Sequence, residues 1–191
     1  MSKELIDFLS QYATFNDDEL RIIENESDVR EYPKGYVLLR EGEMATNTFL
    51  VLKGCVRSYY IKDGEEKNTE FFIEHDLITP VSCVVKAPSE YYIECLEDCI
   101  VSIGSRERTE QFMAAHPRLV SMCRKILEDV AASQQISWDR FRNLTAEEHY
   151  QEIMAKRPEL LERIPQYHLA SYLGIQPQSL SRIRKRLALK D

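Results

Sequence analysis

The pattern of hydrophobic and polar positions changes twice along the chain, and each change predicts a different kind of structure. Apolar clusters at helical spacing in residues 1–28 predict short helices. Between Val29 and Gly104, short β-type segments alternate with glycine-containing turns, which is typical of a small sandwich or barrel. After Gly104 the apolar period is helical. This order predicts an α+β protein in which a β-domain precedes an all-α region.

The strands expected in the β-region are short and are separated by turn residues. They are Tyr36–Leu39, Thr48–Leu52, Val56–Ile61, Thr69–Ile73, Tyr91–Cys95 and Cys99–Ile103. Asp63-Gly64 lies between two of these segments, and such a dipeptide favours a tight hairpin because both residues tolerate positive φ. The sequence therefore predicts a hairpin centred on these two residues.

A long helix is expected from Pro117 to about Asn143, since no glycine or further proline interrupts this segment. At 1.5 Å per residue it would span roughly 40 Å. One apolar stripe in this region includes Leu119, Cys123, Ile126, Val130, Phe141 and Leu144, and an adjacent one includes Val120, Leu127, Ala131 and Trp138. Two stripes fit either a helix that wraps over the core or a two-fold dimer seam. We favour the seam, with Leu119, Cys123, Ile126 and Val130 as its contacts.

Shorter helices are expected on either side of the long one. Ser105 is a suitable N-cap for a helix that ends at His116. Thr145 and Glu148 have the spacing of a capping box and predict a further helix, which ends before Pro158.

The segment Gln166–Ala188 has the pattern of two helices that meet at a tight turn. Ala170 is small enough for the two helix axes to approach each other, and Gly174 permits positive φ at the turn. Pro177 suits the first position of the second helix. The segment therefore predicts a helix-turn-helix.

The outward face of the second helix carries side chains that suit DNA. Leu180, Ile183 and Leu187 form its inward stripe. Gln178, Ser179 and Arg182 are the candidate base contacts, and Arg184, Lys185 and Arg186 are the candidate phosphate contacts. The first set projects from the N-terminal half, which is the half of a recognition helix that reaches base edges in the major groove. The alternative is an ordinary helical hairpin with a solvated basic face.

The distribution of charge favours the DNA interpretation. The formal net charge of −7, from 25 basic and 32 acidic residues, argues at first against a nucleic-acid-binding protein. However, residues 164–191 carry a net charge of +4, so residues 1–163 carry −11. The positive charge is thus concentrated on the helix that would face the phosphate backbone.

The other reactive side chains do not predict an enzyme or a metal site. The five cysteines are widely spaced, and the N-terminal segment does not resemble a signal peptide, so reduced thiols in a cytoplasm are expected. Cys95 and Cys99 are expected on one face of a strand, as buried apolar residues. Only His75 lies in the β-region, which disfavours a cupin-like metalloenzyme. The sequence has no nucleophile elbow, phosphate loop or dinucleotide motif, and no apolar run long enough to cross a membrane.

Three stretches of the chain resemble the Crp/Fnr-type transcription regulators, in the compact form common in the Bacteroidetes. They are Lys34–Glu43, Phe49–Val56, and Ile164–Gly174 followed by Leu180–Arg184. The resemblance implies a double-stranded β-helix of the cyclic-nucleotide-binding type at 1–116, a dimerisation helix at 117–143 and a helix-turn-helix domain at 144–191. It further implies a bacterial cytoplasmic homodimer that binds double-stranded DNA at an inverted repeat, with RNA polymerase as a further partner.

The resemblance also allows a prediction about the effector. Family members that bind cyclic AMP carry a Gly-Glu pair and, about ten residues later, an Arg-Ser pair that neutralises and cradles the phosphate. By alignment, Thr79 and Pro80 replace the first pair, and Pro88 replaces the arginine before Ser89. We therefore expect no tight binding of cyclic AMP and no resident cofactor.

Two alternatives remain open: the pocket binds another small molecule, or side chains fill it and it binds no ligand. Candidate lining residues are Thr79, Pro80, Pro88, Ser89, Tyr91, Gln134 and Gln135. The N-terminal cysteine cluster of the family's iron–sulfur sensors is missing, while a haem ligand is not excluded. The alternative function is a small-molecule-binding β-roll whose helical tail binds protein instead of DNA.

Overall fold

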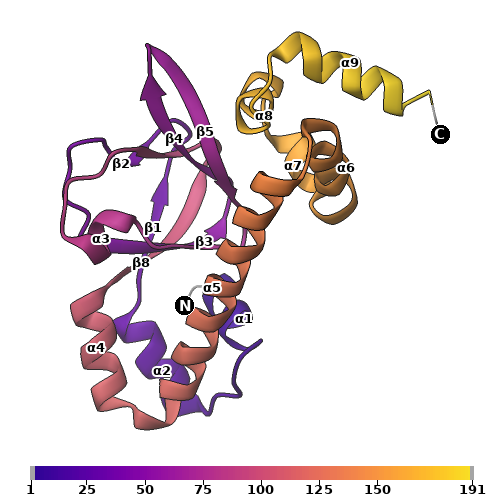
Figure 1. Cartoon of the computed structure of the whole chain (residues 1–191). Helices are drawn as coiled ribbons and strands as arrows, with labels where there is room; N and C mark the ends of the chain where they lie inside the picture. Colours follow the sequence, from indigo (N-terminus) through magenta and orange to yellow (C-terminus); the bar gives the residue numbers. More distant parts are fainter. Residues whose placement is uncertain (1–2, 190–191) are drawn as a thin grey trace. The chain divides into compact units, whose positions relative to one another are not determined.

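The computed structural model describes residues 3–189, and its elements are labelled in Figure 1. The chain forms two compact units. The first unit comprises Met1–Arg57 and Phe71–Ala132, and the second comprises Ser58–Glu70 and Ser133–Asp191. The second unit is therefore assembled from two separate stretches of sequence, and its boundaries differ from the three regions expected above.

The strands form two four-stranded sheets within the described residues. The first has the order β1 (Asp28–Tyr32), β8 (Cys99–Ser105), β3 (Asn47–Lys53) and β6 (Leu77–Ile78). The second has the order β2 (Val37–Leu39), β7 (Tyr92–Cys95), β4 (Val56–Lys62) and β5 (Glu65–Phe72). The pairs β1–β8, β2–β7, β3–β6 and β3–β8 are antiparallel. This topology, followed by the C-terminal helices, confirms the predicted α+β fold with a β-roll.

The core of the β-roll consists of alternate residues that point inward from the strands. Val51, Val56, Ile93 and Val101 are completely buried, and they belong to one apolar cluster. The Asp63-Gly64 hairpin is also confirmed, since these residues connect β4 to β5 with φ angles of 55° and 76°. A two-residue hairpin loop of type I′ requires positive φ at both positions, and this turn matches the right-handed twist of the strands.

The N-terminal helices pack together in a second cluster of the first unit. Helices α1 (Lys3–Leu9) and α2 (Asp17–Glu26) contribute Leu5, Phe8 and Ile23, which pack with Leu50 and Leu52 of β3. Helix α4 (Arg106–Ala115) begins at the predicted N-cap, where the hydroxyl of Ser105 accepts a hydrogen bond from the backbone N–H of Arg108. A short 3-10 turn (Pro117–Leu119) then leads into α5 (Val120–Asn143).

The second unit contains the C-terminal helices. They are α6 (Ala146–Lys156), α7 (Pro158–Arg163), α8 (Gln166–Tyr172) and α9 (Pro177–Leu187). The capping box predicted at the start of α6 is present, with Thr145 and Glu148 each accepting a hydrogen bond from the other's backbone N–H. Tyr150, Ile153, Leu160, Leu169 and Leu180 are among the buried residues of these helices.

Several local expectations are wrong or incomplete. Strands β1 and β6 and the short helix α3 (Val81–Val85) were not expected from the pattern. Cys95 ends β7 and Cys99 begins β8, so the two thiols flank a turn instead of sharing one strand. The acidic pair Glu97-Asp98 and the preceding bend break the strand between them. Among the described helices, none is long and apolar enough to span a bilayer.

Candidate nucleic-acid interface

The turn between α8 and α9 has the geometry that the sequence predicts. Gly174 has a φ of 69°, and its N–H donates to the carbonyl of Ser171. The N–H of Ile175 donates to the carbonyl of Ala170, whose side chain is completely buried. These two hydrogen bonds form a Schellman motif, which ends α8 and turns the chain towards α9.

Helix α9 has one buried face and one exposed face. Leu180, Ile183 and Leu187 are buried in the second unit. Gln178 and Arg182 are exposed, and Ser179 is half-buried. The helix therefore presents two of the three candidate base contacts fully to solvent, and the third in part.

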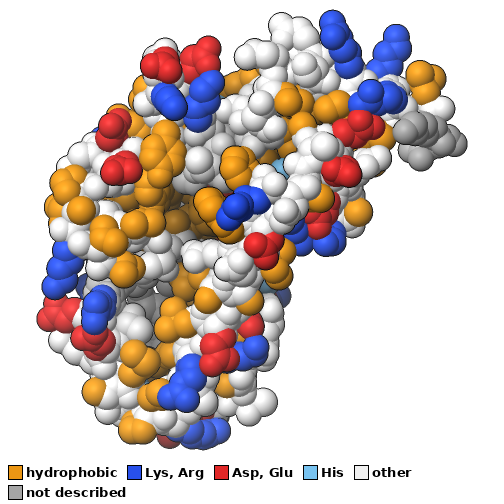
Figure 2. Space-filling model, in the orientation of Figure 1, with side chains coloured by type: hydrophobic (Ala, Val, Ile, Leu, Met, Phe, Trp, Pro, Cys, Tyr) orange, Lys and Arg blue, Asp and Glu red, His pale blue; other side chains and the backbone are white. Residues whose placement is uncertain are grey.

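The cations of α9 fall into two groups. Arg182, Arg184 and Lys185 are exposed and have no acidic partner within ion-pair distance among residues 3–189. Arg186 is different, because its Nε lies 3.2 Å from Oε1 of Glu147 on α6, and its Nη2 contacts Oε2 of the same carboxylate. Figure 2 shows Lys and Arg side chains gathered over α9. Three cations are thus available for an external anion, and one is engaged within the unit.

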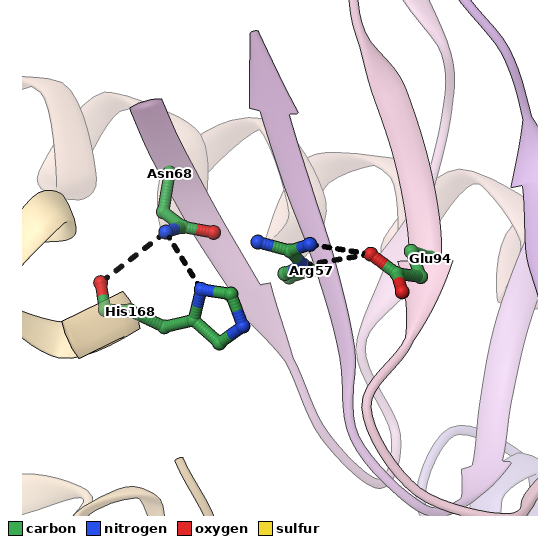
Figure 3. A network of polar contacts seen from close by, with 4 residues as sticks. All are labelled: Arg57, Asn68, Glu94 and His168. Carbon is green, nitrogen blue, oxygen red and sulfur yellow. Dashed lines mark hydrogen bonds and ion pairs between the residues drawn. The ribbon is translucent and has the colours of Figure 1, made fainter. Parts of the chain in front are cut away.

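The β4–β5 hairpin contacts α8 through a small set of polar groups. The hydroxyl of Ser171 accepts a hydrogen bond from Asn68 N–H at 3.0 Å and donates one to the carbonyl of Glu66 at 2.9 Å. The side-chain nitrogen of Asn68 lies 3.4 Å from the carbonyl oxygen and 3.2 Å from Nδ1 of His168 (Figure 3). Asn68 and His168 are both buried. At least 100 residues separate the partners in sequence, so no local pattern predicts these contacts.

Three ionisable side chains are partly or largely buried near this contact. Glu70 accepts hydrogen bonds from Ser137 at 2.8 Å and from the hydroxyl of Tyr172 at 3.4 Å. Burial raises the pKa of Tyr172, and the carboxylate of Glu70 raises it further. The ring of His149 packs against that of Tyr172 with 5.2 Å between centroids. Burial lowers the pKa of His149, although the nearby Glu152 carboxylate opposes this shift.

The two stripes of α5 have different surroundings. Leu119 is buried, and Ile126 packs against the apolar cluster of the first unit, so these two candidate dimer contacts face the chain's own core. Cys123 and Val130 are half-buried. The exposed residues Leu127, Ala131, Gln134, Trp138 and Phe141 recur at alternating spacings of four and three. This spacing is that of a coiled-coil seam. Leu127, Ala131 and Trp138 belong to the second of the two predicted stripes, whereas Phe141 belongs to the first.

Most candidate effector residues of the first unit lie around Tyr91. Its hydroxyl accepts a hydrogen bond from the backbone N–H of Val81 at 2.9 Å. Val81 directly follows Pro80, which is buried. Ser89 is buried, and its hydroxyl donates to the Tyr91 carbonyl at 2.8 Å. Thr79 is half-buried and Pro88 is exposed. The backbone N–H at the start of α3 is therefore already satisfied by a tyrosine of the same unit.

The remaining candidates are elsewhere in the fold. Gln134 and Gln135 are exposed on the part of α5 that belongs to the second unit, and Gln135 donates a hydrogen bond to Asp139 at 3.1 Å.

The β-region matches a known family. Residues 29–116 match the family described as the cyclic nucleotide-binding domain. No curated protein sequence matches the chain.

Solved structures of Crp/Fnr-type regulators have the same fold as the whole chain. The c-di-GMP-responsive global regulator CLP of Xanthomonas campestris has a TM-score of 0.66 at 18% identity, covering 92% of this chain and 93% of its own. FixK2 of Bradyrhizobium japonicum has a TM-score of 0.64 at 21% identity, covering 86% and 85%. The catabolite activator protein of Thermus thermophilus has a TM-score of 0.54 at 19% identity, covering 96% and 87%. The predicted resemblance is therefore confirmed.

The first unit also contains a buried ion pair that sequence reasoning missed. Arg57 on β4 is 3% exposed, and its Nε lies 3.0 Å from Oε2 of Glu94 on β7 (Figure 3). A single arginine within a strand gives no local signal, because only the pairing of β4 with β7 brings it to its carboxylate. The charge of Arg57 is balanced within the domain by that carboxylate.

Proposed function

We propose that this chain is a homodimeric transcription regulator of the Crp/Fnr type, which binds double-stranded DNA with α9. The observation that carries the proposal is the set of exposed cations on α9, namely Arg182, Arg184 and Lys185, that have no acidic partner among residues 3–189. The Gly174 turn holds this helix in a helix-turn-helix, and the same fold is found in the regulators named above. The proposal assigns no catalytic reaction to the chain, and it places the protein in the bacterial cytoplasm.

The side chains of α9 have separate roles in this proposal. Gln178, Ser179 and Arg182 contact base edges, since a glutamine can pair with adenine and an arginine with guanine. Arg184 and Lys185 contact phosphates, which position the helix without reading sequence. Arg186 has a different environment, because it pairs with Glu147 on α6.

The dimer seam in this proposal runs along the exposed stripe of α5 that includes Leu127 and Trp138. Two recognition helices that bind the half-sites of one palindrome lie about 34 Å apart, which is one turn of B-DNA. The expected operator is therefore an inverted repeat, and RNA polymerase is the expected partner of the bound dimer.

We further propose that the effector, if one binds, is not cyclic AMP. The aligned arginine is replaced by Pro88, and the hydroxyls of Tyr91 and Ser89 already bond within the domain. A cyclic phosphate would therefore lack the arginine that neutralises it in the family members that bind cyclic AMP. Isothermal titration calorimetry should show no micromolar binding of cyclic AMP, and a micromolar dissociation constant would refute this part of the proposal.

Binding to DNA is the direct test of the function. The full-length protein is used to select sites from random double-stranded DNA, and its affinity for the enriched sequence is then measured from about 50 to 300 mM salt by fluorescence anisotropy. We expect an inverted repeat and a steep loss of affinity with salt, because each neutralised phosphate releases counterions. Failure to enrich any sequence, together with weak binding that does not depend on salt, would favour the protein-binding tail instead.

A further inference from the structure

Arg186 differs from the other cations of α9 because it already has an acidic partner. We propose that Arg186 is a positioning residue, which fixes the C-terminal end of α9 to α6 through Glu147 and does not contact phosphate. This inference rests on the proposed function, since it divides the cations of α9 into those that contact DNA and one that holds the helix in place.

The contact between the two side chains is bidentate. Nε and Nη2 of Arg186 both donate to the carboxylate of Glu147, one to each oxygen. A guanidinium and a carboxylate that meet in this way are coplanar, and two parallel hydrogen bonds fix their relative orientation. Most exposed ion pairs contribute little, but bidentate geometry is the recognised exception. The Glu147 side chain is also partly shielded from water, at 28% exposure.

The position of each charge on its helix strengthens the pair. Glu147 lies in the first turn of α6, where a negative charge is stabilised by the helix dipole. Arg186 lies in the last turn of α9, where a positive charge is stabilised. The adjacent Glu148 accepts hydrogen bonds from Thr145 in the capping box, so it has a separate structural role. The pair therefore joins the two helix ends that favour its charges.

A contact between Arg186 and phosphate would break this arrangement. The guanidinium would leave Glu147, and an unpaired carboxylate would then remain beside a DNA-facing helix. Arg184 and Lys185 lose no ion pair when they bind a phosphate, since they have none among the described residues. The phosphate contacts of α9 are therefore made by Arg184 and Lys185.

The first test compares the salt dependence of single variants on the selected inverted repeat. Lys185→Ala is the matched control, and it should reduce the slope of log affinity against log salt by about 0.9, as expected for one lost phosphate contact. Arg186→Ala should leave the slope at the wild-type value. It should still lower affinity for the repeat about threefold, while affinity for unrelated DNA stays constant, because a misplaced helix loses base contacts.

The variants of Glu147 separate the two roles by the sign of their effect. If Arg186 is a positioning residue, Glu147→Ala lowers affinity for the repeat as Arg186→Ala does. Arg186→Lys should fall between alanine and wild type, since lysine keeps the charge but cannot pair through two parallel bonds. If Glu147→Ala instead raises affinity, or Arg186→Ala reduces the slope like the control, Arg186 is a phosphate contact and the inference is wrong.

A thermal double-mutant cycle tests the pair without DNA. Arg186→Ala and Glu147→Ala should each lower the melting temperature by about 2 °C, and the double variant should lower it no further than either single variant. Additive losses would contradict the inference. If wild-type protein fails to bind DNA at all, the proposed function fails, while this cycle still decides whether the pair fixes the two helices.

Discussion

Single residues determine where the helices of the second unit end and which groups they bury. Gly174 is the clearest case, because the sequence pattern requires positive φ at this position and the structure has it. The buried pair of His149 and Tyr172 is the opposite case. Neither residue stands out in the sequence, since their environment comes from the packing of α6 against α8.

Substitution of Gly174 should therefore be costly although the site has space. A Cβ at this position would meet no atom within 4 Å, so the loss comes from the backbone conformation alone. Gly174→Ala should lower the free energy of unfolding by about 1–2 kcal/mol, measured by urea denaturation. Gly174→Asn is the matched control and should lose less, because asparagine adopts this conformation more readily. Equal losses for both variants would contradict the assignment to backbone strain.

The depressed pKa of His149 gives the protein a defined pH dependence. Burial disfavours the charged ring, so the unfolded chain binds a proton at a higher pH than the folded chain does. Stability should consequently fall as the pH drops below about 6.5, the ordinary value for histidine. His149→Gln removes this contribution, so its stability relative to wild type should rise between pH 7.5 and 5. A constant difference between the two proteins over that range would show that His149 does not titrate in this way.

At the scale of elements, the pattern of the sequence predicts most helices and the central strands but not what they pack against. Helix α5 shows this limit. Its two stripes are visible in the sequence, yet only the fold of the first unit shows that Ile126 is covered and Leu127 is not. Strand β6 was missed because it has only two residues, and β1 because three of its five residues are charged. Their pairing with β3 and β8 defines them.

The edge of β5 offers a prediction about long-range contacts. This strand is last in its sheet, and the hydroxyl of Ser171 bonds both to Glu66 C=O and to Asn68 N–H. Ser171→Ala removes a partner from two backbone groups, which should cost about 1–2 kcal/mol of unfolding free energy. Amide hydrogen exchange at Asn68 should accelerate. Ser179→Ala on α9 is the control, and similar exchange at Asn68 in both variants would argue against this role of Ser171.

At the scale of the whole molecule, the proposed dimer depends on the exposed stripe of α5. Leu127 is 55% exposed and Trp138 is 58% exposed. The ring centroids of Trp138 and Phe141 lie 6.5 Å apart. Apolar side chains at this spacing are expected to pack against a second copy of the helix. Net charge is the other whole-molecule property, and its division into an acidic body and a basic tail was predicted from the sequence alone.

Leu127→Lys should therefore weaken the dimer. Two lysines would meet across the two-fold axis and would replace an apolar contact, so light scattering after size exclusion should show about half the wild-type mass at micromolar concentration. Glu128→Lys is the control, since it also introduces a lysine, at the neighbouring exposed position outside the stripe. Unchanged mass for both variants would place the dimer seam elsewhere or remove it.

Because the second unit is built from two separate stretches of sequence, recombination of gene segments cannot easily transfer it as a whole. Residues 58–70 belong to the same compact unit as the helix-turn-helix, although they are encoded within the β-domain. A single genetic crossover within α5 would transfer His168 and Ser171 to a new protein and leave Asn68 behind. In the recombinant protein, α8 would pack against the β4–β5 hairpin of a different protein. A helical unit of this kind is inherited intact only when two separate segments of the gene move together.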